Sequence, residues 1–452
     1  MTAQQLTKDF EIRANISNAF MLDNEDEDMQ ENANSDLVAI YADDDPDGLL
    51  SARQIANYCK SRKVKCRVFI SDWKDFGMSD TVLEKIRQEN AQEIYILDVG
   101  SDKNVLSKVQ TFKCPVHVFD NHPPTIVNPE YEEWTEYTAK LPDNINLLTT
   151  TESCTAGLTW DYLASIGYSN DWNDIWAILG LEADVAIDKG LGKQTANKIL
   201  QRHPSLGAFY QLVYKKAGQT TWSTMEYPIL SRFSAIFNSG RRTLYNEGSA
   251  LAFKAIGEIE EMGDVFSLVT NKSADITEKP NLSRLLGCYE DWDNKWFKES
   301  ISKGLHIKYP KLFGVSIVNH AWNLGSRVCN YKADREAVPW ACINFGTPDV
   351  IHISGRLGTH VESAIATTVG LSDKKVPNEG HIGIWFHNLT KASNGKITGG
   401  GIKEAGSALC PKGIGTQYIL DALCKAFSPD AFPITSEVLK ENEDVVVQAS
   451  DL

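Results

Sequence analysis

A dense group of carboxylates follows the first strongly apolar run of the chain. In the stretch VAIYADDDPDG, four of five consecutive positions are aspartates: Asp43, Asp44, Asp45 and Asp47. Carboxylates repel one another, and burying even one costs several kcal/mol unless it is paired or bound to a metal ion. The cluster therefore needs a positively charged partner.

Three later segments deliver acidic side chains in a similar way. Asp98 follows EIYIL, Asp120 ends VHVFD with His122 two residues on, and Asp184 follows the helical pattern WNDIWAILGLEA. Strand-like and helical segments alternate around them, as in a parallel, doubly wound sheet. Ligands bind beyond the carboxyl ends of the strands in such sheets, so these groups should meet at one edge.

This donor set indicates a metal site. Carboxylate oxygens with one imidazole suit Mn²⁺ or Mg²⁺, and two such ions about 3.5–4 Å apart can activate water and clamp a phosphoryl oxygen. Each aspartate alone could instead cap a helix or form a turn, but four acidic sites in order with a histidine favour the metal. The predicted ligands are Asp43, Asp45, Asp98, Asp120, His122 and Asp184.

The whole chain has the pattern of an α/β protein. The patterns DLVAIYA, KCRVFI, EIYILDV and PVHVFD predict the strands of the first sheet. A mostly helical stretch follows, and then LFGVSIVNH, PWACINF, DVIHIS and GHIGIWFH predict further strands, with a helix at GTQYILDALCKAF. We expect an acidic tail (1–36), a catalytic domain (37–192), a helical linker region (193–305), a smaller α/β domain (306–430) and a second acidic tail (431–452).

Charge and cysteine usage narrow the class of protein. The net charge is −15, and residues 1–36 carry nine acidic and two basic side chains. The run from Asp23 to Glu31 indicates a solvated, disordered tail. Overall acidity opposes non-specific duplex binding but allows a narrow basic channel for a single strand. Nine cysteines without a C-x-x-C pair indicate reduced, mostly buried thiols.

The sequence shows no membrane or export signal. No apolar run approaches the roughly 20 residues of a membrane span, and the N-terminal segment lacks the apolar core of a signal peptide. We therefore expect a cytoplasmic protein with no membrane partner.

The motifs and their order resemble the DHH phosphoesterase superfamily, and within it the RecJ-like single-strand exonucleases. DDDPDG matches the first motif, D-x-D-x-D-G, and LDVGS matches the second, which implies that Asp98 bridges two metals. FDNHPPTIVNP resembles the D-H-H motif and implies that His122 lies near the scissile phosphate, while LGLEADVAID resembles the fourth motif and points to Asp184. The resemblance thus implies catalytic roles for His122 and Asp98 and two divalent cations, Mn or Mg.

The resemblance extends to about residue 425. PILSRFSAIFNSGRR looks like the signature of the RecJ linker helices, and ISGRLG and GGGIKEAGSA resemble motifs of the DHHA1 domain. Glycines let backbone N–H groups approach an anion, and an arginine can bind phosphate through two hydrogen bonds. The implied substrate-binding residues, which would line a channel between the domains, are Arg232, Asn238, Arg241, Arg356, Gly399, Gly400, Gly401 and Lys403.

Two positions depart from the family pattern. Asn121 stands where D-H-H has its first histidine, normally a metal ligand, and an amide oxygen is a weaker, uncharged ligand. Ile402 stands where the glycine-rich loop normally has a histidine that helps to hold phosphate or substrate. Neither change removes the carboxylates.

The sequence therefore predicts a metal-dependent exonuclease that degrades single-stranded DNA from 5′ to 3′ in DNA repair or recombination. The acidic tails could recruit a replication or repair protein. A phosphodiesterase of short oligoribonucleotides or cyclic dinucleotides remains an alternative, although the linker signature argues against it. A non-catalytic replication scaffold is another; Asn121 favours it and the retained aspartates oppose it.

Overall fold

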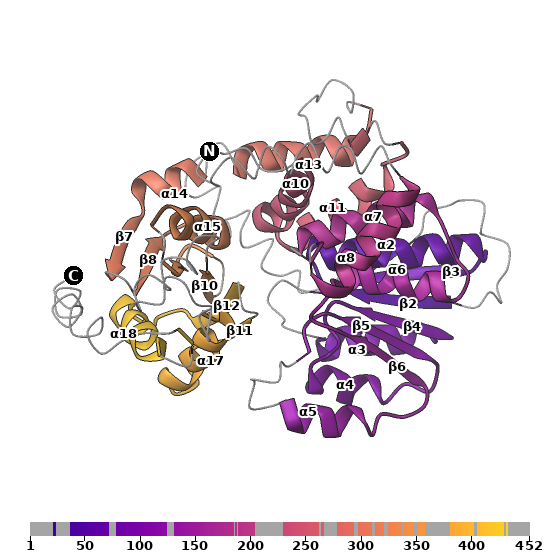
Figure 1. Cartoon of the computed structure of the whole chain (residues 1–452), viewed down its shortest axis with the longest axis horizontal. Helices are drawn as coiled ribbons and strands as arrows, with labels where there is room; N and C mark the ends of the chain where they lie inside the picture. Colours follow the sequence, from indigo (N-terminus) through magenta and orange to yellow (C-terminus); the bar gives the residue numbers. More distant parts are fainter. Residues whose placement is uncertain are drawn as a thin grey trace. The chain divides into compact units, whose positions relative to one another are not determined.

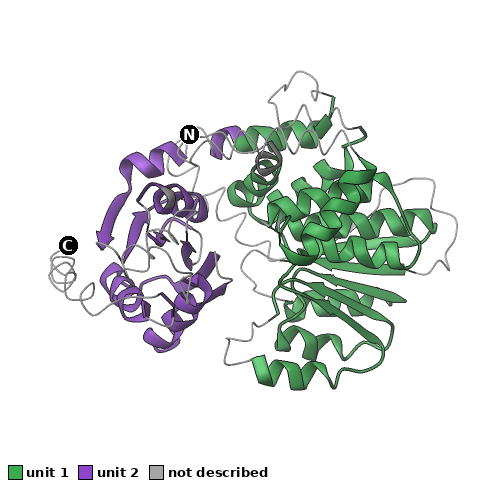
Figure 2. Cartoon of the chain, in the orientation of Figure 1, with its two compact units in different colours: residues 1–214, 228–289 green, residues 215–227, 290–452 purple. Residues whose placement is uncertain are grey.

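The computed structural model divides the described chain into two compact units, coloured separately in Figure 2. The first comprises residues 1–214 and 228–289, and the second comprises residues 215–227 and 290–452. The described residues are 21–23, 37–71, 78–123, 131–184, 186–187, 189–203, 229–261, 264–265, 278–292, 297–309, 312–320, 324–336, 338–347, 350–357, 380–401, 405–428 and 431–432.

The first unit is built on a six-stranded sheet with strand order β1-β3-β2-β4-β5-β6. Strands β2 to β6 pair in parallel, whereas β1 pairs antiparallel with β3. The bounds are β1 Met21–Asp23, β2 Leu37–Ala42, β3 Lys65–Ile70, β4 Glu93–Leu97, β5 Val116–Asp120 and β6 Ile145–Thr149. The predicted strands are confirmed, whereas β6 was not predicted and β1 lies within the predicted acidic tail (1–36).

Helices cover both faces of this sheet, as Figure 1 shows. On one face lie α2 (Pro46–Ser61), α6 (Thr155–Ser165), α7 (Asp171–Ala183) and α8 (Gly190–Arg202). On the other lie α3 (Asp80–Gln88), α4 (Lys103–Val109) and α5 (Tyr131–Thr138). The central strands are therefore buried on both sides, and every residue of β2 from Val38 to Ala42 is buried, as expected of a covered parallel sheet. The predicted doubly wound fold is confirmed.

Part of the predicted linker region belongs to the first unit. It contributes α10 (Ile229–Leu244), α11 (Asn246–Gly257) and α13 (Pro280–Glu290). Helix α10 contacts α7 and α11 contacts α2. The backbones of α10 and α11 approach so closely that a Cβ added at Gly248 would lie within 1.8 Å of the Gly240 carbonyl oxygen. Residues 229–289 of the predicted linker region therefore pack on the catalytic domain.

The second unit contains a mixed six-stranded sheet with order β11-β12-β10-β9-β8-β7. Only the β8–β9 pair is parallel. The bounds are α14 Lys298–Lys303, β7 Leu305–Tyr309, β8 Phe313–Val318, α15 Gly325–Glu336, β9 Trp340–Asn344, β10 Val350–Arg356, α17 Ile382–Ala392, β11 Thr398–Gly401, β12 Ala405–Pro411 and α18 Thr416–Ala426. The predicted smaller α/β domain is thus present, with strands β7, β11 and β12 in addition.

The segment GHIGIWFH is helical, so the strand predicted there is wrong. It begins α17, where His381 caps the first turn by accepting from the Ile384 N–H. Ile382, Trp385, Phe386 and Leu389 are all buried against the sheet. Their i, i+3, i+4, i+7 spacing becomes visible only when the run is followed beyond its first eight residues.

All nine cysteines are free thiols, and six of them are buried. This agrees with the prediction that the thiols are mostly buried. Among the helices of the described segments, none is long and apolar enough to cross a membrane.

Candidate metal centre

The carboxylates meet because neighbouring strands end in step. The Asp43 N–H donates to the carbonyl of Leu97 at 3.0 Å, and the Asp98 N–H donates to the carbonyl of Phe119 at 2.8 Å. Each acidic residue that follows a strand is thereby tied to the end of the next strand. The prediction that these side chains share one edge of the sheet agrees with this register.

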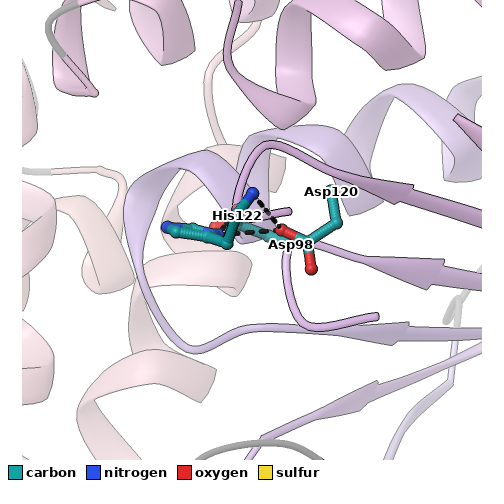
Figure 3. Close-up of side chains that lie close together, drawn as sticks. All are labelled: Asp98, Asp120 and His122. Carbon is teal, nitrogen blue, oxygen red and sulfur yellow. Dashed lines mark hydrogen bonds and ion pairs between the residues drawn. The ribbon is translucent and has the colours of Figure 1, made fainter. Parts of the chain in front are cut away.

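Two groups of potential ligands share one carboxylate. Ligand atoms of Asp43, Asp45 and Asp98 lie within 4.8 Å of one another, and so do those of Asp98, Asp120 and His122. In Figure 3 the His122 ring lies against both of its carboxylate partners, with Nδ1 3.5 Å from Asp98 Oδ1 and 2.8 Å from Asp120 Oδ1. A carboxylate common to two groups is the arrangement that bridges two cations.

Asp98 holds this central position through an unusual backbone. Its φ is +66°, a left-handed conformation that costs about 1–2 kcal/mol for most residues and is better tolerated by aspartate. The side chain is 2% exposed, and the Thr155 hydroxyl lies 2.9 Å from its Oδ1. Burial and the surrounding aspartates raise the pKa of Asp98 well above its usual value.

Asp120 and His122 form a closed pair. Asp120 accepts hydrogen bonds from the Ser101 N–H at 2.7 Å and the His122 N–H at 3.0 Å. Burial alone would raise the pKa of Asp120, but its bonds to His122 and Ser101 lower it below the usual value. Although burial opposes the charged ring, Asp120, Asp184 and Asp45 raise the pKa of His122 to about 10.

Asp184 and Asn121 complete this side of the centre. Asp184 follows the last residue of α7, and the Asn121 side-chain amide donates to its Oδ2 at 2.6 Å. The Thr155 hydroxyl lies 2.9 Å from Asn121 Oδ1 as well as near Asp98. Asn121 therefore lies among the predicted ligands, 6% exposed, with its amide held from both ends. Burial, reinforced by Asp45, raises the pKa of Asp184 to about 6.

The donor set fits a hard divalent cation. Its oxygens come from several buried or half-buried carboxylates, and burial, reinforced by neighbouring aspartates, raises the pKa values of Asp43, Asp98 and Asp184. One imidazole accompanies them. Such sites bind Mn²⁺ or Mg²⁺, and bound cations would offset the repulsion.

Asp47, the last aspartate of the cluster, acts as a helix cap. Its carboxylate accepts from the backbone N–H groups of Thr155 at 2.7 Å and Ala156 at 2.9 Å, at the start of α6. Asp45 likewise accepts from the N–H of Asp47 at 2.9 Å at the start of α2. A Cβ added at Gly48 would lie 2.6 Å from the Asp43 carbonyl oxygen. The glycine thus lets α2 begin directly beneath the strand end.

Arg241 neutralises the remaining aspartate. Its guanidinium forms an ion pair with Asp44, whose side chain is 6% exposed. Burial of Asp44 outweighs this pair and raises the pKa of its carboxyl to about 7. Arg241 was predicted to bind substrate, and the structure brings it from α10 to the edge of the carboxylate cluster.

The other predicted substrate-binding residues lie on α10, in the second unit or outside the described part of the chain. The Asn238 amide faces the Ser234 hydroxyl on α10 at 3.4 Å. The Arg232 side chain and Lys403 lie outside the described residues. In the second unit, Arg356 ends β10 and donates to the carbonyl of Gly355 at 2.7 Å.

The three glycines form β11 and have different surroundings. A Cβ at Gly399 would lie 2.5 Å from the Ala408 Cβ, and Gly401 has a φ of +151°. A Cβ at Gly400 would meet no described atom within 4 Å. Packing therefore explains the glycine at position 399, and backbone conformation explains the glycine at position 401. The described packing gives no reason for Gly400.

Sequence reasoning missed the polar residues that orient the ligands. Thr155 contacts both Asp98 and Asn121, the Ser71 hydroxyl donates to Asp43 at 2.6 Å, and the Ser101 N–H binds Asp120. Thr155 is the first residue of α6. No local spacing connects these residues to their partners, which lie 19 to 57 residues away in the chain.

A third acidic group has a structural explanation. Ligand atoms of Asp171, Asp174 and His203 lie within 4.8 Å of one another. Asp174, however, already accepts from Trp160 Nε1 at 2.5 Å and Arg202 Nη2 at 2.7 Å. Because the guanidinium neutralises the buried carboxylate, we assign no metal to this group.

Comparison with known proteins places this geometry among solved structures. No family model and no curated protein sequence matches the chain. RecJ from Thermus thermophilus in complex with Mn²⁺ is similar, with a TM-score of 0.54 and 15% identity over 87% of this chain, which spans 52% of that protein. An exonuclease RecJ bound to manganese gives a TM-score of 0.52 and 15% identity, covering 90% of this chain and 94% of that one. CDC45 from Entamoeba histolytica gives 0.52 and 9% identity, covering 94% and 98%.

At these identities the similarity establishes architecture. The parallel sheet with helices on both faces and the second mixed sheet recur in the RecJ structures. The chain therefore shares the fold of the RecJ structures.

Proposed function

We propose that the protein is a metal-dependent phosphodiesterase that cleaves single-stranded nucleic acid. The observation that carries this proposal is Asp98, which belongs to both groups of potential ligands at the edge of the sheet. Helix caps and turns do not require three carboxylates and an imidazole to converge around one buried aspartate. The RecJ structures with a similar fold contain manganese, which is consistent with this donor set.

The chain's own residues have distinct roles in this proposal. Asp43, Asp45, Asp98, Asp120 and Asp184 would hold two cations, which would lower the pKa of a bound water and neutralise charge on the phosphoryl group. With Nδ1 of His122 directed at Asp120, Nε2 is the ring atom left to contact a phosphate oxygen.

Single-stranded DNA, cleaved from the 5′ end, is the substrate that we propose first. Arg241 lies beside the carboxylates with a guanidinium suited to a phosphate. In the second unit, Gly400 leaves backbone accessible at a position where the described packing does not demand a glycine. The predicted contacts by Arg232, Asn238, Arg356 and Lys403 remain part of this proposal. A role in repair or recombination, and a partner for the acidic tails, would follow from such an activity.

A non-catalytic scaffold is the second candidate. It is favoured by Asn121, whose amide occupies the position of a histidine ligand and already binds Asp184. The similarity to CDC45 is compatible with it. On this alternative the carboxylates would remain without a hydrolytic role.

A cleavage assay tests the proposal. The purified protein is incubated with 5′- and 3′-labelled single-stranded DNA, short RNA and cyclic dinucleotides, with Mn²⁺ or Mg²⁺. We expect Mn²⁺-dependent release of nucleotides from the 5′ end of DNA, and at least a hundredfold loss in Asp98→Asn. Preferential cleavage of short RNA or cyclic dinucleotides would instead identify the small-substrate alternative.

Two controls make the assay decisive. Asp421→Asn changes an exposed carboxylate of α18 and should leave activity unchanged. The activity of a trace contaminating nuclease would be the same in preparations of Asp98→Asn and Asp421→Asn. Equal activity of the two variants would therefore reject the proposed centre. Absence of cleavage by the unmodified protein on every substrate, at saturating Mn²⁺, would favour the scaffold.

A further inference from the structure

Helix α5 presents aromatic and acidic side chains on different faces. Tyr131, Trp134 and Tyr137 recur at a spacing of three, and a helix places such positions along one side. Glu132, Glu133 and Glu136 lie on the opposite side and are all exposed. No residue of α5 is buried, so its aromatic face contributes little to the core.

Tyr137 fixes the helix to the domain. Its hydroxyl accepts from Gln110 Nε2 at 2.8 Å, and its ring packs against the core formed by α3, α4 and the sheet. Tyr131 and Trp134 do not join that core. Their rings stack on each other instead, with centroids 6.3 Å apart and planes inclined by 28°, and each side chain is half-buried.

A short chain of hydrogen bonds connects Trp134 to the metal centre. Its indole N–H donates to the Ser101 carbonyl at 2.8 Å, and the Ser101 N–H donates to Asp120 at 2.7 Å. Asp120 in turn holds His122. Two residues, Ser101 and Asp120, and three hydrogen bonds therefore connect Trp134 to His122, the proposed phosphate contact.

We propose that Tyr131 and Trp134 form a stacking platform for a nucleobase of the substrate, close to the scissile phosphate. This inference rests on the proposed function, because it requires a single-stranded nucleic acid at the metal centre. Aromatic faces bind bases of any sequence in single strands, and the acidic side chains of α5 lie on the face away from the rings, where they repel the phosphates least. The platform would favour a substrate with a base over the same backbone without one.

The alternative is that Trp134 only holds the backbone at Ser101 in position, through the hydrogen bond from its indole N–H. The two roles differ in their response to substitution. Trp134→Phe keeps an aromatic face and loses the hydrogen bond, whereas Trp134→Ala loses both. If Trp134 stacks on a base, Trp134→Phe should keep most of the activity and Trp134→Ala should lose it. If Trp134 only holds the Ser101 backbone, both substitutions should lose activity equally.

The experiment measures kcat/KM with Mn²⁺ on two single-stranded DNA sets. The first set carries a base at every position. Each strand of the second set carries one abasic site, at the first, second or third position. We expect Trp134→Ala to lose about 5- to 150-fold on based DNA, which corresponds to one stacked base, and much less on the abasic strand that removes that base. Trp134→Phe should keep most of the preference, and Tyr131→Ala should weaken it.

A matched control removes another half-buried indole. Trp172 lies in the first turn of α7, about 18 Å along that helix from Asp184, and Trp172→Ala should keep the preference for the based strand. Equal losses for Trp134→Ala and Trp134→Phe, or equal losses on based and abasic strands, would overturn the platform.

A binding readout separates this inference from the proposed activity. In an Asp98→Asn background, a strand with 2-aminopurine at the stacked position should show quenched fluorescence on binding, and Trp134→Ala should restore it. If the unmodified protein cleaves nothing, the proposed function is wrong. The quenching experiment still tests whether Trp134 stacks on a base, because it does not require cleavage. Quenching that is unchanged by Trp134→Ala would overturn the platform even in an active enzyme.

Discussion

Replacing Asp184 by asparagine should stabilise the metal-free protein and abolish part of its response to metal. The substitution keeps the shape of the side chain and an oxygen that can accept from the Asn121 amide. It removes a carboxylate whose pKa is raised, chiefly by burial, from its usual 3.8 to about 6. The ionised form of Asp184 therefore destabilises the folded chain when no cation is bound.

The size and pH dependence of this effect follow from linkage. A pKa raised from 3.8 to about 6 corresponds to about 3 kcal/mol of lost stability. Below about pH 4 the carboxyl is protonated in both states and the cost vanishes. Between pH 4 and 6 the unfolded chain releases its proton first, so stability falls as the pH rises. Above about pH 6 the full cost remains.

The assay is urea unfolding of the metal-free protein at pH 4.5 and pH 8, with Asp421→Asn as an exposed control. We expect Asp184→Asn to raise the free energy of unfolding by about 3 kcal/mol at pH 8 and by much less at pH 4.5. Mn²⁺ stabilises a native state that binds it, so the variant should also gain less from Mn²⁺. A loss of stability at pH 8, or an undiminished gain from Mn²⁺, would refute the assignment of Asp184 as a ligand in a repulsive cluster.

Three further predictions test the supports of the centre. Gly48→Ala should lower the free energy of unfolding in urea by about 1–3 kcal/mol, because its Cβ would lie 2.6 Å from the Asp43 carbonyl oxygen. Gly287→Ala in α13, where a Cβ meets no described atom within 4 Å, should instead raise it by about 1 kcal/mol. Similar effects of the two substitutions would contradict the packing argument. Asp44→Leu and Arg241→Met should each cost about 3 kcal/mol singly and less than the sum when combined, because one change leaves a buried charge without its partner; additive unfolding energies would show that the pair is not coupled. Asn121→His should tighten Mn²⁺ binding in calorimetric titrations, since an imidazole is the stronger ligand, and unchanged affinity would show that position 121 is not a ligand.

The sequence determined the parallel sheet and the acidic edge because both depend on local patterns. Alternation of apolar strands and amphipathic helices fixes a doubly wound sheet, and each acidic residue follows directly on its strand or helix. The end of a strand is thus known from the same pattern that predicts the strand. Parallel pairing then brings those ends to one edge, as the bonds from Asp43 to Leu97 and from Asp98 to Phe119 show.

Local pattern failed where burial depended on distant partners. The strand predicted at residues 380–387 is the start of α17, because its apolar run suits either element until Leu389 extends the helical face. Strand β1 lies in a strongly acidic segment and forms only by pairing with the edge of β3. Neither outcome is encoded in a short window of residues.

Only the tertiary structure decided which role each aspartate of the cluster takes. Asp43, Asp44, Asp45 and Asp47 are chemically identical and adjacent, yet one pairs with Arg241 of α10 and another caps α6 more than 100 residues away. The same holds for Trp134, whose link to the metal centre passes through the Ser101 loop. Sequence sets which charges are available, but the direction of each side chain depends on long-range packing. A carboxylate acquires its partner, its pKa and its function from neighbours that the local sequence does not specify.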